Sequence, residues 1–409
     1  MRTARRSGTS VAQTSDFRLR TPPNSGRRHL EGTQVKLQRK NRRALALGAL
    51  AVSGALALTA CGSDDTSGNS ASSDSSASAQ TGNIQCDDAK GQLQASGSSA
   101  QKNAIDAWVK NYTAACKDVQ INYRPDGSGA GITAFLQGQT SFAGSDSALK
   151  PEEIEDSKKI CTDGQAIDLP MVGGPIAIGY NVPGVDELVL DAATISEIFD
   201  SKITNWNDKK IAKLNPDAKL PDLKIQAFHR SDESGTTDNF TKYLKAAAPK
   251  AWPYEPGKSW EAKGGQSAQG SSGVAQQVKQ TEGAISYFEL SYAKDINTVD
   301  VKTEAAEPVK ATIENATAAI GAAKVVGTGK DLALELDYTP EAEGAYPLVL
   351  VTYEIACDKG NKADTLPATK SFLNYMASED GQGLLADAGY APMPEEIITK
   401  VRDTISSLS

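Results

Sequence analysis

Short apolar runs of strand type alternate with amphipathic runs of helix type from residue 84 onward. The stretch 100–116 is typical, because its apolar residues recur at helical spacing and share one face. Regular alternation of this kind predicts an α/β fold whose strands are mostly parallel. The expected strands are 92–95, 119–123, 142–145, 166–170 and 175–181, and the expected helices are 100–116, 132–138, 151–158 and 238–247.

Three strand-to-helix steps share one composition, a loop of small and hydroxyl-bearing residues. They read QASGSSA at 94–100, RPDGSGAG at 124–131 and FHRSDESGTT at 228–237. Ligands of α/β sheets bind beyond the carboxyl ends of strands, where helices begin with unpaired N–H groups. Small residues let an anion approach those groups, and Arg230 adds a forked cation. The steps predict a site for a small tetrahedral oxyanion, although each loop alone also fits an N-cap and turn.

A carboxylate follows the expected strand in FAGSD at 142–146. Asp146 either caps the following turn or faces the same oxyanion. A carboxylate repels a fully ionised anion, but it accepts a hydrogen bond from an anion that still carries a proton. In the second case the site would accept hydrogen phosphate and reject sulfate, because a buried polar group left unpaired is costly.

The beginning of the chain carries the signs of export. A basic cluster at 39–43 precedes an apolar run at 44–60 that is marginal as a membrane span. The run leads into Leu-Thr-Ala-Cys, which resembles a bacterial lipobox and so implies cleavage before Cys61 and lipid attachment to it. The alternative is an ordinary secretory signal with a spare cysteine. We assign 1–60 as the leader and 61–83, rich in Ser, Ala, Asp and Gly, as a disordered tether.

Charge and cysteine content indicate an extracytoplasmic body. Beyond residue 60 the chain has 31 Lys and Arg against 49 Asp and Glu, a net charge of −18 that argues against nucleic acid as a partner. An anion site must therefore be made by local dipoles. Four cysteines in the body allow three pairings in an oxidising compartment, and we favour Cys86–Cys116 and Cys161–Cys357. With no Cys-x-x-Cys motif and only His229 after the leader, we expect no metal site.

An enzyme is the first alternative class. His229, Ser231 and Asp232 are close in sequence, but neighbours on an extended strand point to opposite faces. No G-x-S-x-G elbow occurs, and a phosphatase would need metal ligands or an activated nucleophile. We therefore expect a binding protein, not an enzyme, and no cofactor.

With these elements in this order, the chain closely resembles the phosphate-binding proteins of bacterial ABC-type phosphate importers, the Pst system. The motifs that carry the resemblance are SGSSA at 96–100, GSGAG at 127–131, FAGSD at 142–146 and RSDESGTT at 230–237. The similarity runs from about residue 93 to 405. One departure lies in the first loop, where many members have threonine and phenylalanine at the positions of Ser99 and Ala100; the hydroxyl and the backbone donor are both kept.

The resemblance implies a set of phosphate ligands. Ser99 and Ser128 would donate hydroxyl groups, and Ala100 would donate its backbone N–H. Asp146 would accept the phosphate proton, and Arg230 would supply the guanidinium contact. The remaining implied residues are Ser234, Gly235 and Thr236 in the third loop and Asp232, which would orient the guanidinium.

The resemblance also implies a fold and partners. The fold is a two-lobed periplasmic-binding-protein fold, type II-like, with a mostly parallel sheet flanked by helices in each lobe and phosphate in the cleft between them. The lobes would be 84–171 plus 347–409, and 172–346. The protein would be a monomer, anchored outside the cytoplasm by Cys61, that delivers phosphate to the permease and ATPase subunits of an importer. The alternatives are a binding protein for sulfate or molybdate and a surface phosphate sensor or adhesin.

Overall fold

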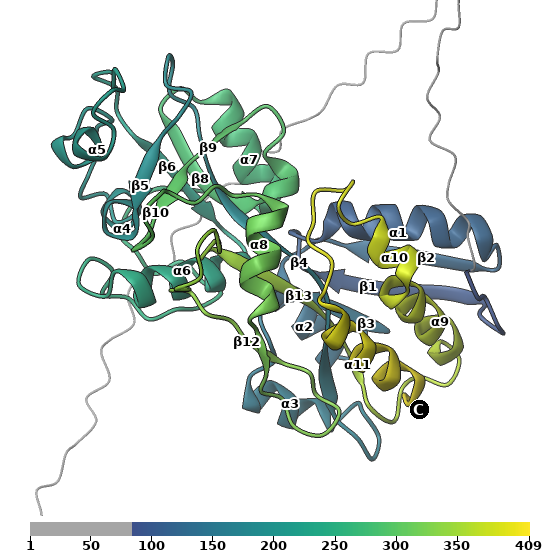
Figure 1. Ribbon diagram of the computed structural model, residues 1–409. Coiled ribbons are helices and arrows are strands. Elements are labelled where there is room, and N and C mark those ends of the chain that lie inside the picture. The colour runs from purple at the N-terminus through teal and green to yellow at the C-terminus, as the bar shows by residue number, and fades with distance from the viewer. Residues whose placement is uncertain (1–83) are drawn as a thin grey trace, which may run out of the picture. The chain divides into compact units, whose positions relative to one another are not determined.

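The computed structural model describes residues 84–409 (Figure 1). The expected leader, the lipidation residue Cys61 and the tether lie outside these residues. In the described part, no helix combines the length and the apolar character that a membrane crossing requires. Helices and strands alternate along this part of the chain, as expected for an α/β protein.

A mixed sheet runs through the described part, in the strand order β2-β1-β3-β13-β4-β8-β6-β7, with β9 joined to β4. The β1–β2, β1–β3, β6–β7 and β6–β8 pairs are parallel, whereas β13 and β4 pair antiparallel to their neighbours. The strands of this sheet are β1 Gly91–Gly97, β2 Val119–Arg124, β3 Phe142–Ser145, β4 Ala166–Tyr180, β6 Gln226–Arg230, β7 Gln266–Ala268, β8 Ala284–Glu289, β9 Asn297–Thr298 and β13 Val349–Cys357. Two small ladders lie apart from it, β5 Val189–Asp191 with β10 Asp300–Lys302, and β11 Lys324–Val325 with β12 Leu334–Glu335.

The long strand β4 joins the two parallel groups of strands. Its first part pairs with β13, and its last part, from Ile176 to Tyr180, pairs with β8. The prediction of separate strands at 166–170 and 175–181 was therefore wrong. Gly173 does not break the strand but marks a close approach, because a Cβ there would overlap Ile320 Cδ1.

The helices flank the two parallel groups. In Figure 1, α1, α9, α10 and α11 gather around β1 and β2, while α4 to α7 lie around β5, β6 and β8. The helices are α1 Lys102–Ala115, α2 Ser128–Leu136, α3 Pro151–Ser157, α4 Ala192–Phe199, α5 Lys209–Leu214, α6 Gly235–Ala247, α7 Gly270–Gln280, α8 Ile313–Gly321, α9 Leu366–Ala377, α10 Glu379–Gly383 and α11 Glu395–Ser406, with a short 3₁₀ turn, η1, at Leu290–Tyr292.

Helix α2 begins at Ser128, four residues before the expected start at 132. Its N-cap is Gly127, whose φ of 104° lies in the region that favours glycine. A Cβ on Gly127 would lie 2.5 Å from Asp232 Oδ2, so the missing side chain also allows this close approach. Both reasons depend on tertiary context, which the helical pattern of the sequence does not contain.

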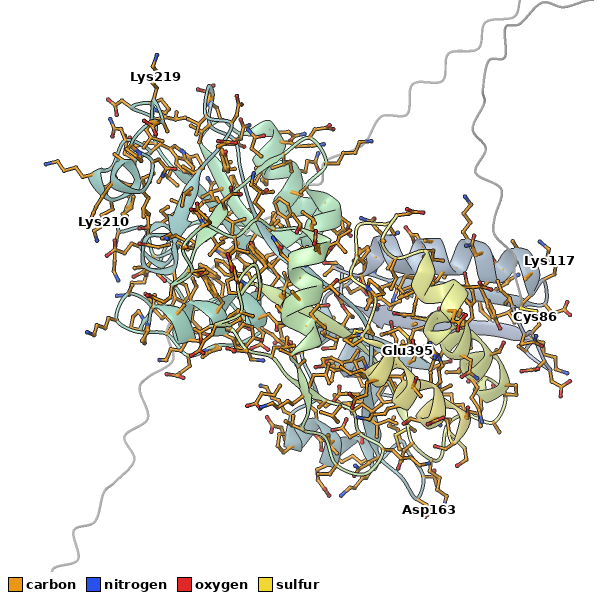
Figure 2. The ribbon with its side chains drawn as sticks, viewed as in Figure 1. Cys86, Lys117, Asp163, Lys210, Lys219 and Glu395 are labelled. Atoms are coloured by element: carbon orange, nitrogen blue, oxygen red, sulfur yellow. A yellow bond between two sulfur atoms is a disulfide. The ribbon has the colours of Figure 1, made fainter. Side chains whose placement is uncertain are left out.

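Buried aromatic rings hold α6 in place. Phe240 stacks on Tyr287 of β8 with ring centroids 4.2 Å apart, and Phe199 of α4 contacts Phe240 edge-on at 5.0 Å. All three side chains are buried. Many charged side chains lie at the periphery, and Figure 2 shows Lys117, Asp163, Lys210 and Lys219 at the edges of the body.

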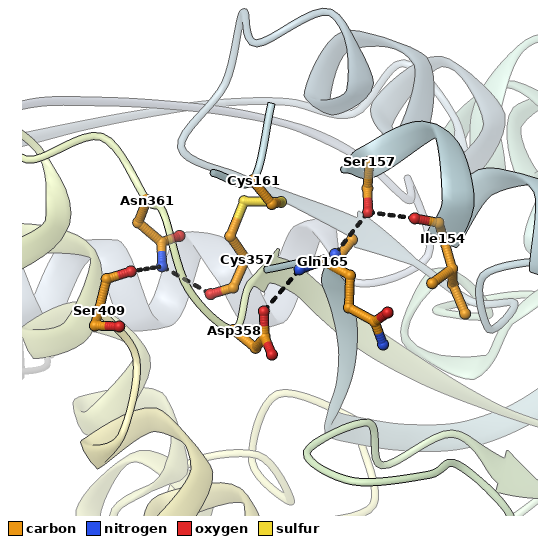
Figure 3. Close-up of a disulfide and its surroundings, with 9 residues drawn as sticks. Ile154, Ser157, Cys161, Gln165, Cys357, Asp358, Asn361 and Ser409 are labelled. Carbon is orange, nitrogen blue, oxygen red and sulfur yellow. Dashed lines mark hydrogen bonds between the residues drawn. A yellow bond between two sulfur atoms is a disulfide. The ribbon is translucent and has the colours of Figure 1, made fainter. Parts of the chain in front are cut away.

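Both expected disulfides are present. Cys86–Cys116 ties the segment before β1 to the end of α1, and Cys161–Cys357 ties the segment after α3 to the end of β13, each with a Cα–Cα distance of 5.4 Å. Hydrogen bonds surround the second bridge (Figure 3), including one from Asn361 Nδ2 to the Cys357 carbonyl at 2.7 Å. The pairing favoured from the sequence is confirmed.

Candidate anion-binding site

Ser128 joins three of the predicted segments. Its Oγ accepts hydrogen bonds from the backbone N–H of Asp146 at 3.2 Å and of Gly235 at 3.1 Å. These contacts bring together the start of α2, the end of β3 and the start of α6. Gly235 is required sterically, because a Cβ there would lie 2.7 Å from both Asp146 Cβ and Ser128 Oγ.

The first loop reaches the same place through a residue that the sequence analysis did not select. Ser271, in the first turn of α7, donates its N–H to Ser99 Oγ at 2.9 Å, and the two hydroxyls lie 3.2 Å apart. The Ala100 N–H donates to Ser98 Oγ at 3.0 Å, so its role as a ligand donor stays a prediction. Tyr292 Oη donates to the Ser99 carbonyl at 2.7 Å and holds this loop from the side of η1.

Arg230 is buried, and Asp232 orients it. Its Nε donates to Asp232 Oδ1 at 2.8 Å and its Nη2 bonds to Asp232 Oδ2, a bidentate pair. Nη1 remains on the side of Thr236 Oγ1, at 3.4 Å, and Ser271 Oγ, at 3.3 Å. Burial favours a higher pKa for Asp232, but the hydrogen bonds and charge of Arg230 hold that pKa below its usual value.

Asp146 has two hydroxyl partners. Thr236 Oγ1 donates to its Oδ2 at 3.1 Å, and Thr352 Oγ1 of β13 donates to its Oδ1 at 2.8 Å. Burial raises the pKa of Asp146, while hydrogen bonds from Thr352 and Thr236 and the charge of Arg230 oppose the rise. Because a carboxylate accepts about four hydrogen bonds, the two hydroxyls leave acceptor capacity free.

The remaining residues of the third loop support the start of α6. Ser234 Oγ caps the helix by accepting the Thr237 N–H at 3.1 Å, which is the N-cap role considered for this segment. Asn239 Nδ2 donates to the Asp146 carbonyl at 2.7 Å and to the Gly235 carbonyl at 2.8 Å, so it fixes the carboxylate segment against the same turn.

The structure thus gathers the predicted side chains into one buried cluster. Helices α2, α6 and α7 all begin there, so their N–H groups and dipoles supply partial positive charge beside the single guanidinium. The side chain of Arg230 is 1% exposed, so its charge acts with little screening by water. Such an arrangement has many hydrogen-bond donors and one carboxylate that is not used by an ion pair, Asp146.

Two further residues belong to this cluster. Ser271 lies in QGSSG at 269–273, a small-residue segment at the start of α7, so its composition carried the same signal as the three selected loops. Thr352 lies inside the fully buried strand β13, where no local pattern distinguishes it. Only the pairing of β13 with β3 brings Thr352 to Asp146.

His229 is not part of the cluster. Its ring stacks on Trp260 with centroids 4.8 Å apart, and its Nδ1 contacts the Arg230 carbonyl at 3.0 Å. Asp232 is bound to the guanidinium, so the His-Ser-Asp grouping does not form a triad. Among residues 84–409, no group of three or more His, Cys, Asp or Glu side chains is placed to hold a metal ion.

The fold and the cluster define a binding protein of the two-lobed periplasmic class, and the family model of the PBP superfamily domain matches residues 72–380. The chain is 40% identical over 376 residues to phosphate-binding protein PstS 3 of Mycobacterium tuberculosis, covering 90% of this chain and 99% of the relative. It is 39% identical over 366 residues to PstS 2 of the same organism, covering 88% and 97%. The chain belongs to the PstS family of phosphate-binding proteins.

Solved structures share the fold. PfluDING, a high-affinity periplasmic phosphate-binding protein solved with bound phosphate, has a TM-score of 0.63 at 21% identity and covers 76% of this chain and 93% of its own. A phosphate-bound substrate-binding protein of a putative phosphate ABC transporter from Clostridium perfringens has a TM-score of 0.54 at 22% identity and covers 74% and 100%.

Proposed function

We propose that this protein binds inorganic phosphate outside the cytoplasm and delivers it to an ABC-type phosphate importer. The observation that carries the proposal is the buried cluster in which Arg230 and several hydroxyl and N–H donors surround one carboxylate, Asp146. The names and phosphate-bound structures of its relatives support the same ligand.

The ligands we assign come from both groups of strands. Ser99, Ala100, Ser128 and Asp146 come from the first group, and Arg230 with the third loop comes from the second. The remaining assigned residues are Ser234, Gly235 and Thr236. We add Ser271 and Thr352, because they bond to Ser99 and Asp146.

Phosphate selectivity follows from the single carboxylate. Hydrogen phosphate has a proton that Asp146 accepts, whereas sulfate has none at neutral pH and meets the carboxylate with like charge. Calorimetric titration with phosphate, sulfate and molybdate tests the ligand. We expect tight binding of phosphate and at least about 100-fold weaker binding of sulfate. The lost hydrogen bond to Asp146 and the repulsion between Asp146 and sulfate together cost about 3 kcal/mol. Preference for sulfate or molybdate would establish the alternative oxyanion-binding function.

We assign the lobes as 84–171 plus 347–409, and 172–346, with closure around the ligand as the motion that an importer recognises. Two polar contacts cross the proposed boundary. Ser147 Oγ donates to Asp238 Oδ2 at 2.7 Å, and Lys258 Nζ lies 3.3 Å from Glu153 Oε1 with both side chains largely buried. X-ray scattering in solution should show a smaller radius of gyration with saturating phosphate, and an unchanged radius would refute closure.

The proposed cellular position is the outer face of the cytoplasmic membrane, with a lipid on Cys61. Replacement Cys61→Ala should release the protein into the medium, whereas the nearby Ser63→Ala control should stay with the membrane fraction. Retention of the Cys61→Ala protein in the membrane fraction would contradict lipid anchoring. We further propose that the protein is a monomer with no enzymatic activity, which phosphate-ester turnover assays and light scattering test.

A further inference from the structure

Glu354 is a buried acid beside the anion site with no role in the phosphate contacts above. It lies in β13, two residues after Thr352, and pairs in register with Gly144 of β3. Its side chain is fully buried, and neither carboxyl oxygen has a hydrogen-bond partner among the described residues. A buried carboxylate without donors is strongly disfavoured, so this group requires an explanation.

A second buried side chain nearby has an acceptor atom to which no described residue donates a hydrogen bond. Gln101, at the start of α1, is also fully buried, and its Oε1 receives no hydrogen bond within the described chain. Its Nε2 donates to Tyr123 Oη at 3.0 Å, which leaves Oε1 as the free end of the amide. A Cβ on Gly144 would overlap Gln101 Nε2 and lie 2.5 Å from Tyr123 Oη, so both groups lie over the strand partner of Glu354.

One proton satisfies both groups. Burial raises the pKa of Glu354 well above its usual range, and the charge of Asp146 adds to the rise. Asp146 and Tyr123 are the titratable groups that interact with Glu354, and burial raises the pKa of Tyr123 well above its usual range, so Tyr123 is neutral as well. A neutral carboxyl group is a donor, and the amide oxygen of Gln101 is an acceptor without a donor.

We propose that Glu354 is a protonated carboxylic acid that donates to Gln101 Oε1 and, through Gln101 and Tyr123, positions the first phosphate-binding loop. Tyr123 links Gln101 to the first loop, because its Oη accepts from Gln101 Nε2 and donates to the Ser98 carbonyl at 2.8 Å. Glu354 is therefore a positioning residue for phosphate binding, and this role rests on the function proposed above.

Ser98 is the point at which this chain of hydrogen bonds reaches the ligand groups. Its Oγ accepts the Ala100 N–H at 3.0 Å. The next residue, Ser99, bonds to Ser271 across the site. A proton on Glu354 contributes orientation without adding negative charge beside the anion, whereas an ionised Glu354 would repel it.

Three single variants and one double variant test the proposal by phosphate calorimetry at neutral pH, with thermal unfolding as the check on folding. Glu354→Gln is neutral and keeps a donor, so its affinity should stay within about 2-fold of the wild type. Glu354→Leu and Tyr123→Phe each break the chain and should weaken binding about 5- to 20-fold, the range for one lost buried hydrogen bond. Both substitutions interrupt the same chain of hydrogen bonds. The loss of phosphate affinity in the Glu354→Leu/Tyr123→Phe double variant should therefore be much smaller than the product of the two single losses.

The proton itself is tested by infrared difference spectra of wild type and Glu354→Gln at neutral pH. The wild type should show the carbonyl band of a protonated carboxylic acid that Glu354→Gln lacks, while Glu396→Gln, at an exposed carboxylate, should not remove it. At alkaline pH, the phosphate affinity of the wild type should fall relative to that of Glu354→Gln. Phosphate and Glu289 titrate in both proteins, so their effects cancel in this comparison.

Absence of that band in the wild type, or unchanged phosphate affinity in a folded Glu354→Leu protein, would overturn the proposal. If the wild type bound no phosphate, the proposed function and the positioning role would both fail. The infrared result would then still show whether Glu354 carries a proton, so the two failures are distinguishable.

Discussion

Replacement of Asp146 by Asn is the sharpest test of phosphate selectivity. The carboxylate accepts from Thr236 Oγ1 at 3.1 Å and from Thr352 Oγ1 at 2.8 Å, and both hydroxyls point their protons at it. An amide has one acceptor oxygen and one NH₂ donor. One threonine hydroxyl must therefore turn, and the phosphate proton loses its ionised acceptor.

The magnitude follows from these contacts. Loss of one hydrogen bond to a charged group costs about 1.5–3 kcal/mol, so phosphate should bind about 10- to 150-fold more weakly. Sulfate should bind more tightly, because like charges about 4 Å apart repel by ~4 kcal/mol at an effective dielectric constant near 20. The ratio of sulfate to phosphate dissociation constants should fall by at least about 100-fold.

Calorimetric titration of both proteins with both anions, at one ionic strength and neutral pH, measures this ratio. Asp232→Asn is the matched control, because Asp232 is a buried carboxylate that is already bound to Arg230. Asp232→Asn should weaken the binding of both anions and leave the ratio of their dissociation constants nearly unchanged. An unchanged ratio in Asp146→Asn, or an equal shift in Asp232→Asn, would refute the assignment of Asp146 as proton acceptor.

Three further predictions concern charge, the disulfide and pH. Arg230→Ala leaves Asp232 buried and unpaired, so chemical denaturation should show a free energy of unfolding about 3–5 kcal/mol lower than that of the wild type. The Arg230→Ala/Asp232→Ala double variant should recover part of this stability, and neither variant should bind phosphate. Replacing both Cys161 and Cys357 by Ala should lower the free energy of unfolding by about 2–5 kcal/mol; no change in denaturant midpoint would contradict this. Burial raises the pKa of Glu289 to about 8, above its unfolded value, so its contribution to stability is lost as pH rises toward 8. Glu289→Gln should therefore gain stability over the wild type above pH 8 and not below pH 5, as thermal unfolding at each pH will show.

Local features of the sequence were sufficient for much of the site. Loops of small and hydroxyl-bearing residues before helices need no long-range information to be recognised, and the loops that contain Ser99, Ser128 and Arg230 were predicted in this way. Ser271 carried the same local signal. Thr352 and Glu354 did not, because they lie in a strand buried on both faces, where composition mainly reports burial.

The boundaries of elements depended on packing. Two predicted strands proved to be one, β4, which continues through Gly173, where the missing side chain allows a close approach of α8. Helix α2 starts four residues early because Gly127 lies against Asp232, a contact between residues more than 100 positions apart.

The sequence alone indicated the alternation of strands and helices and the small, hydroxyl-bearing loops, one of them with Arg230, from which an anion site is predicted. These are properties of short segments, set by backbone propensity, periodicity and side-chain chemistry. The tertiary structure alone decided which hydroxyls face Asp146, that Asp232 is used by Arg230, and that Glu354 lies beside Gln101. Such contacts depend on strand register and on burial, and burial also sets the charge that each acid carries.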